Sequence, residues 1–99
     1  MFLGFRADFK CEYCGLDFFS SVGAYKLWQQ DHIDRHAGDH LENLALACLV
    51  CNVKLKNRWT PSAWQGMTRS EKIKDARAYV IGQRKLVQEE IDSYRKLLE

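Results

Sequence analysis

The clearest periodic pattern lies toward the C-terminal end of the chain. Apolar side chains recur there at steps of three, four or seven residues, which is the spacing of one face of an α-helix. The residues of this stripe are Ile73, Ala76, Val80, Val87, Ile91, Tyr94 and Leu98. Thr68 and Glu71 have the spacing of a capping box. The pattern therefore predicts a helix from about Arg69 to Leu98, with Gly82 as its weakest point.

The length of this helix raises the question of what covers its apolar stripe. At about 1.5 Å per residue it would be near 45 Å long, which is more than a domain of this size can cover. We expect the first half of the stripe to pack on the chain's own core. The second half either packs as well or forms the seam of a homodimer through the C-terminal helix, and both alternatives stay open.

Two shorter apolar segments precede the helix and are typical of a β-hairpin. The segment Tyr25–Ile33 places Leu27 and Trp28 among polar residues, as in a strand, and Leu44–Ala47 fits a second strand. The polar stretch from Asp34 to Asn43, which contains a glycine, is expected to be the loop between them. Residues 16–24 contain two serines and a glycine, which predicts a loop with some strand.

The remaining segments give weaker signals. Phe2, Phe5 and Phe9 fit either one face of a helical turn or a packed arm. Residues 52–58 resemble a short basic helix. Thr60 can cap a further helix, with Pro61 at its first position. With two strands and several helices in 99 residues, the chain is expected to form a single α+β domain.

The composition indicates the cell compartment in which the protein is expected. Hydrophobic residues make up 46% and charged residues 28%, as in an ordinary soluble protein. No apolar run approaches the roughly 20 residues that span a bilayer, and the first ten residues are too polar for a signal peptide. We therefore expect a cytoplasmic protein with no membrane partner. In that reducing compartment its four cysteines are not expected to form disulfides.

The cysteines form two Cys-x-x-Cys pairs. They are Cys11, Cys14, Cys48 and Cys51. Two residues between ligands let both thiolates of a turn face one ion, and two such turns complete a tetrahedral shell of four sulfurs. This pattern predicts a structural Zn²⁺ site with no coordination position left for water.

Charge is distributed unevenly along the chain. From Asp8 to Glu42 seven acidic side chains stand against three basic ones, whereas from Asn52 to Lys74 six basic ones stand against one acidic. A basic stretch next to an acidic one fits a polyanion held against a cation site. Solvated helix faces would give the same count, so charge alone does not decide.

A specific resemblance comes from the order of residues around the cysteines. The first cysteine pair is followed by Asp31-His32-Ile33 and then by Asn43-Leu-Ala-Leu-Ala-Cys48, after which Asn52 directly follows the second pair. In this order the chain resembles the HNH endonuclease family over roughly residues 9–58. The resemblance implies a ββα-metal core at 9–58 within a single domain 1–99, followed by the C-terminal helix at 69–98.

The resemblance also implies roles for four residues in DNA phosphodiester hydrolysis. His32 would be the general base, since a neutral imidazole can take a proton from water near pH 7. Asp31 and Asn52 would bind one catalytic divalent ion, Mg²⁺ or Mn²⁺, through their side-chain oxygens. Asn43 would bond across the loop and fix the histidine's backbone or ring. Neighbouring residues of a strand point to opposite faces, so Asp31 and His32 can share a site only if the strand ends or bends there.

Two positions depart from the family pattern. The third motif position holds Asn52 rather than the histidine that gives the family its name, which implies weaker metal binding. Members often have a proline shortly after Asp-His-Ile, whereas Asp34 and Arg35 stand here. His36 and His40 lie in the same loop, where they are either solvated or add a metal ligand or substrate contact.

Basic residues downstream of Asn52 are candidates for DNA contacts. Lys54 and Arg58 are four residues apart and share a helix face, so we expect them to bind phosphates. Lys56 lies between them in the same segment and is a further candidate. Arg69 and Lys72 form a candidate second patch. Because phosphate contacts carry no sequence information, weak sequence specificity is expected.

Two other function classes compete with the nuclease. A non-catalytic zinc-stabilised nucleic-acid-binding module would share the cysteines and the basic residues, but it gives no reason for Asp31, His32 and Asn52 together. An adaptor that binds a protein through its long helix is the third class.

Overall fold

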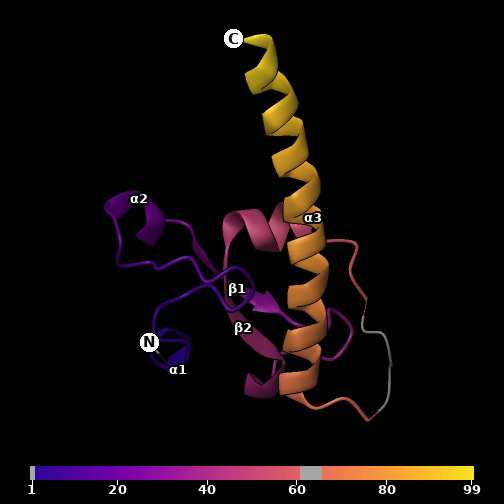
Figure 1. Ribbon diagram of the computed structural model, residues 1–99. Coiled ribbons are helices and arrows are strands. Elements are labelled where there is room, and N and C mark those ends of the chain that lie inside the picture. The colour runs from indigo at the N-terminus through magenta and orange to yellow at the C-terminus, as the bar shows by residue number, and fades with distance from the viewer. Residues whose placement is uncertain (1, 61–65) are drawn as a thin grey trace.

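The computed structural model describes residues 2–60 and 66–99. A small β-hairpin and several short helices form a body, and a long C-terminal helix crosses this body and extends beyond it (Figure 1). In chain order the elements are α1 (Phe2–Arg6), α2 (Val22–Tyr25), β1 (Trp28–His32), the 3₁₀-helix η1 (Leu41–Asn43), β2 (Leu44–Cys48), the π-helix η2 (Val50–Leu55) and α3 (Arg69–Leu97). The expected α+β fold with a long C-terminal helix is confirmed.

The two strands form the predicted antiparallel hairpin. The register places Trp28 opposite Cys48 and His32 opposite Leu44. Every residue of β2 is buried, whereas β1 carries only one buried residue, Asp31. The inner strand of the body is therefore β2, and β1 carries a buried carboxylate that needs polar partners.

Two segments before the hairpin differ from the sequence expectation. Within residues 16–24 the only strand-like feature described is an isolated bridge between Lys10 and Asp17, and the segment then enters α2. The Ser21 side chain accepts a hydrogen bond from Ala24 N at 2.9 Å, so it caps this helix. Tyr25 consequently ends a helix and does not begin the strand. The phenylalanines near the N-terminus lie on or next to a helical turn, α1.

The segment after β2 is helical, but it begins two residues earlier than expected. The π-helix η2 starts at Val50 and ends at Leu55, so the basic residues Lys56 and Arg58 lie after its end. The backbone N–H of Lys56 donates to Cys51 O at 2.8 Å, which closes its last turn. The expected helix start at Thr60 and Pro61 involves position 61, which lies outside the described residues.

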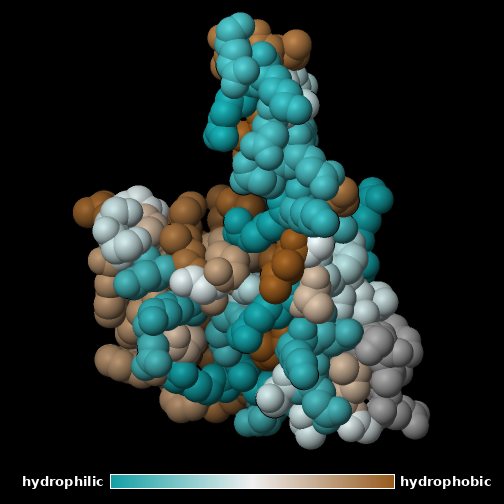
Figure 2. Space-filling model, viewed as in Figure 1, coloured by the Kyte–Doolittle hydropathy of each residue, from teal (hydrophilic) through white to brown (hydrophobic). Residues whose placement is uncertain are grey.

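The capping box of α3 is confirmed, with Thr68 and Glu71 exchanging side-chain and backbone hydrogen bonds. The first half of the apolar stripe is buried in the core, through Ile73, Ala76 and Val80. The second half of α3 extends beyond the body, and its visible face is mostly hydrophilic, with hydrophobic residues at the tip (Figure 2). No helix within residues 2–60 and 66–99 is long and apolar enough to cross a membrane.

Candidate functional site

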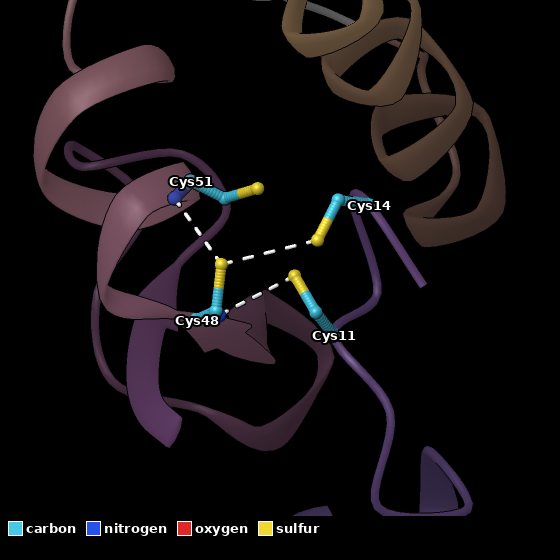
Figure 3. A group of neighbouring side chains, drawn as sticks. All are labelled: Cys11, Cys14, Cys48 and Cys51. Atoms are coloured by element: carbon cyan, nitrogen blue, oxygen red, sulfur yellow. Dashed lines mark hydrogen bonds between the residues drawn. The ribbon is translucent and has the colours of Figure 1, made fainter. Parts of the chain in front are cut away.

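The four cysteines come together in one cluster, which we call the cysteine cluster (Cys11, Cys14, Cys48 and Cys51). Their sulfurs all lie within 4.8 Å of one another, and the Cys14 and Cys48 sulfurs are 3.9 Å apart. Figure 3 shows the four side chains converging from two segments of the chain. A tetrahedral zinc with bonds of about 2.3 Å needs sulfurs about 3.8 Å apart. The donor set and its spacing therefore fit a Zn²⁺ ion.

Local turns aim these sulfurs at one point. The turn after Cys11 closes through a hydrogen bond from Gly15 N to Cys11 O at 2.9 Å, and Gly15 adopts a positive φ of 81° that favours glycine. Backbone N–H groups also donate to sulfur, from Cys48 to Cys11 at 3.3 Å and from Cys51 to Cys48 at 3.4 Å. Each cysteine pair thus supplies two candidate ligands, and the second pair also supplies the backbone donors to the Cys11 and Cys48 sulfurs.

The crowding of four thiols has an electrostatic consequence. A hydrogen bond with Cys14 lowers the pKa of Cys11 to about 6, and hydrogen bonds with the neighbouring thiols lower the pKa of Cys48. Hydrogen bonds with the other three thiols raise the pKa of Cys51. Four sulfurs this close can all be thiolates only with a cation between them.

Arginines of α3 attach this helix to the cysteine cluster. Arg84 Nη2 donates to Cys51 Sγ at 3.3 Å, and Arg77 donates to Glu12 O, within the first cysteine turn, at 2.7 and 3.1 Å. Arg69 Nη2 pairs with Glu12 Oε1 at 2.8 Å. The sequence contains a signal for Arg84, because this arginine lies between Val80 and Val87 at the spacing of the apolar stripe. A charged side chain is unusual at such a position.

A second candidate site is a pocket of about 300 Å³ at the end of β1, which we call the Asp31 pocket. Its lining includes Asp31, His32, Asp34, Asn52, Lys56 and Trp59. The structure thus brings Asp31, His32 and Asn52, predicted as one site, to the same pocket. The strand β1 ends at His32, which meets the geometric condition for adjacent strand residues to share a site.

Asp31 is 6% exposed and has two hydrogen-bonding partners. The Tyr13 hydroxyl donates to Asp31 Oδ2 at 2.5 Å, and Lys56 Nζ lies 3.1 Å from the same oxygen. Burial and the nearby Asp31 carboxylate raise the pKa of Tyr13, so its hydroxyl stays protonated and donates. No sequence pattern pointed to Tyr13, although its place between two cysteines fixes its backbone.

His32 is half-exposed, with 40% of its side chain accessible. Its Nε2 lies 2.5 Å from Asp39 Oδ1, and since a carboxylate only accepts, Nε2 carries the hydrogen. This arrangement leaves Nδ1 of the neutral ring as the nitrogen that can accept a proton. Asp39 is a further residue that the motif comparison did not identify.

The two asparagines occupy different environments. Asn52 Nδ2 donates to Gln29 Oε1 at 2.8 Å, which fixes the side-chain amide while its oxygen is the group suited to a cation. Asn43 bridges the loop instead. Its Nδ2 donates to Asp34 O at 2.9 Å and to Gly38 O at 2.7 Å, and its Oδ1 accepts from Asp34 N. These bonds fix the backbone directly after His32 and Ile33.

The five predicted phosphate-binding residues fall into two groups. Lys54 and Arg58 are exposed. The other three pair with carboxylates of the acidic stretch: Lys56 with Asp31, Arg69 with Glu12, and Lys72 with Asp34. Much of the charge asymmetry in the sequence therefore reflects contacts inside the molecule.

The other two histidines of the loop are exposed. His36 lines the Asp31 pocket, and its backbone N–H donates to Asp34 Oδ1 at 3.0 Å. His40 Nε2 donates to Ala37 O at 2.8 Å and is outside the residues that line the pocket.

Comparison with known proteins gives one match. Residues 11–58 match the family model described as HNH endonuclease. The matched segment begins at the first cysteine of the cluster and ends three residues after η2, so it contains the whole cysteine cluster and most of the lining of the Asp31 pocket, and it excludes Trp59 and α3. No curated protein and no solved structure shows a significant match to the chain.

Proposed function

Residues 11–58 belong to the HNH endonuclease family, and on this premise we propose that the chain is a metal-dependent endonuclease that hydrolyses DNA phosphodiester bonds. The observation that carries the proposal is that Asp31, His32 and Asn52 line one pocket. These residues supply a carboxylate, an imidazole and an amide, which together suit hydrolysis assisted by one divalent ion. The products would be a 5′-phosphate and a 3′-hydroxyl.

In this proposal each side chain of the pocket has a separate task. Asp31 and Asn52 would hold Mg²⁺ or Mn²⁺ through oxygen, the ligand atom that these ions prefer. When bound, the ion supplies Lewis-acid neutralisation of the phosphate and the leaving oxygen. His32 takes the proton of the attacking water through Nδ1, with the ring held by Asp39. Asn43 keeps the loop after His32 in place.

We further propose that the cysteine cluster binds Zn²⁺ as a structural ion. Four protein sulfurs fill a tetrahedral shell, so no position remains for a reactive water. The ion would hold the first cysteine turn against β2 and η2, from which Asn52 reaches the Asp31 pocket. Its role would be to build the frame for catalysis.

DNA would contact the protein mainly through phosphates. Lys54 and Arg58 are the exposed members of the predicted set and remain the strongest candidates. Lys56, Arg69 and Lys72 would need to exchange a carboxylate partner for a phosphate. Because the exposed contacts are few and unspecific for sequence, we expect weak specificity and binding that falls with salt.

The test is cleavage of supercoiled plasmid with Mn²⁺ or Mg²⁺ by the wild type, His32→Ala and His40→Ala. The His40 variant is a matched control, because His40 is an exposed histidine of the same loop that does not line the pocket. Loss of a general base lowers rates by about 10² to 10⁴. We expect that loss in His32→Ala at unchanged zinc content, and near wild-type cleavage in His40→Ala. A wild type that binds DNA but does not cut it in the presence of any divalent ion would instead be a zinc-stabilised binding module.

A double-strand cut requires two pockets, and we propose that α3 supplies them by pairing with a second copy of the chain. The second half of the stripe is exposed and follows a four-three-four spacing: Val87, Ile91, Tyr94 and Leu98. In this register Glu90 and Arg95 occupy opposite flanks of the seam. Parallel helices would therefore place opposite charges next to each other.

The oligomeric state checks this pairing. Sedimentation velocity should detect a concentration-dependent dimer for the wild type and a monomer for Ile91→Glu. Leu86→Glu is the control, because Leu86 is also an exposed apolar residue of α3 but lies off the stripe. A wild type that stays monomeric at high concentration would restrict the enzyme to nicking. Equal dissociation by both variants would place the interface elsewhere on α3.

A further inference from the structure

Two residues that line the Asp31 pocket, Asp31 and Lys56, form a buried polar cluster with Tyr13, which lies outside the pocket lining and which no sequence motif assigns. Tyr13, Asp31 and Lys56 are respectively 1%, 6% and 8% exposed. The tyrosine hydroxyl and the lysine ammonium both approach Asp31 Oδ2, at 2.5 and 3.1 Å. Three polar groups so deeply buried are costly unless they satisfy one another, so their arrangement is fixed by the fold.

Both donors come from the segments that carry the cysteines. Tyr13 lies between Cys11 and Cys14, and Lys56 follows η2, where its backbone N–H bonds to Cys51 O at 2.8 Å. Each half of the cysteine cluster therefore sends one donor to the same carboxylate oxygen. The backbone of these two segments, together with the hydrogen bond of Tyr13 and the ion pair of Lys56, therefore connects the cluster to Asp31.

The two donors approach Asp31 from fixed positions. Lys56 Nζ lies 5.6 Å from the centre of the Tyr13 ring and 5.2 Å from that of Trp59, which are cation–π distances. It also donates to His32 O at 3.2 Å. With Oδ2 engaged by both donors, the carboxylate has one defined orientation, and Oδ1 is its other ligand atom.

We propose that Tyr13 and Lys56 are positioning residues that set how strongly Asp31 binds the catalytic divalent ion, with opposite signs. The inference rests on the proposed function, in which Asp31 is a ligand of that ion. Tyr13 orients the carboxylate without adding charge, so it strengthens binding. Lys56 adds a positive charge about 3 Å from the ligand, so it opposes the binding of a further cation by Asp31.

The experiment measures Mn²⁺ binding to zinc-loaded protein by titration calorimetry and by the electron paramagnetic resonance of free Mn²⁺. Tyr13→Phe keeps the buried ring and removes only the hydroxyl. Loss of such an outer partner typically weakens metal binding by 10–100-fold, and we expect about tenfold here. Lys56→Met keeps the length of the side chain and removes the charge, and we expect Mn²⁺ to bind on the order of tenfold tighter. Tyr25→Phe, at an exposed tyrosine, should match the wild type.

Separate readouts distinguish positioning from a general loss of structure. Zinc content and cooperative thermal unfolding should be retained in Tyr13→Phe, and saturating Mn²⁺ should restore most of its kcat for plasmid cleavage. Unchanged Mn²⁺ affinity in Tyr13→Phe would overturn the role of Tyr13, and weaker binding in Lys56→Met would overturn that of Lys56. A wild type that neither binds Mn²⁺ nor cuts DNA would remove the proposed function, and this inference with it.

Discussion

The cysteine cluster and the Asp31 pocket are built in different ways from neighbouring parts of the chain. The cluster takes all its ligands from two short turns and offers a complete shell of four sulfurs. The pocket takes its candidate ligands from β1 and η2, and the buried donors to Asp31 come from the first cysteine turn and from the residue after η2. Cys51 and Asn52 are adjacent in η2, yet one belongs to each site. The comparison indicates a one-way dependence, in which the pocket needs the cluster and the cluster does not need the pocket.

Removing zinc should have the largest effect, because it should break both sites. Structural zinc contributes about 10–16 kcal/mol in small zinc peptides, which matches or exceeds the roughly 5–15 kcal/mol stability of a typical domain. We expect Cys48→Ser, or chelation at neutral pH, to abolish cooperative unfolding and Mn²⁺ binding together. Near-UV circular dichroism and calorimetry measure this. A metal-free protein with a native spectrum would show that the body is stable without the ion.

Removing a candidate ligand from the pocket should affect one site only. Asn52→Ala deletes the amide oxygen proposed for the divalent ion and also the hydrogen bond to Gln29. Such a hydrogen bond contributes only about 1 kcal/mol to the free energy of unfolding. We expect Mn²⁺ affinity to fall by roughly 10–100-fold, as for other altered metal shells, with zinc content unchanged. Asn57→Ala is the matched control, since Asn57 also lines the pocket but has no assigned role. Loss of zinc in Asn52→Ala would contradict the one-way dependence.

The difference between the sites also explains which features could be predicted from the sequence. The cysteine pairs, the capping box at Thr68 and Glu71 and the hairpin depend on spacings of a few residues, and the structure contains all three. The order of motifs added the family, which the match over residues 11–58 confirms. Each of these signals depends on residues close together in the sequence or on the order of motifs along the chain, so the sequence alone is enough to predict it.

Tertiary contacts could not be predicted in this way. The bond from Tyr13 to Asp31 joins residues 18 positions apart, and the pair of Lys56 with Asp31 is buried although lysine is usually exposed. The sequence predicts phosphate contacts for the basic stretch, and it does not reveal that Lys56, Arg69 and Lys72 pair with acids of the same molecule. The same limit applies at short range, because residues 22–25 form α2 with Ser21 as its N-cap, where the sequence predicts a loop and the start of a strand.

A smaller effect is expected where α3 contacts the cysteine cluster. Arg84 donates to Cys51 Sγ at 3.3 Å and contributes positive charge beside the four sulfurs of the cysteine cluster. Arg84→Gln should release zinc several-fold faster to a competing chelator, at the low end of the 10–100-fold seen for outer partners of metal ligands. Lys85→Gln, the same loss of charge one residue along α3, should release zinc at the wild-type rate. Equal acceleration in both variants would mean that overall charge, and not the bond to sulfur, retains the ion.

The smallest change tests whether α3 can be stabilised without affecting either site. Gly82 lies inside α3, has no positive φ, and an added Cβ would meet no atom within 4 Å. Replacing glycine by alanine in a helix interior is worth roughly 0.5–1 kcal/mol. Gly82→Ala should therefore raise the melting temperature by a few degrees, with zinc release and Mn²⁺ affinity unchanged. Because Gly82 lies two residues before Arg84, a change in zinc release would show that the pitch of α3 at this point is transmitted to the cysteine cluster.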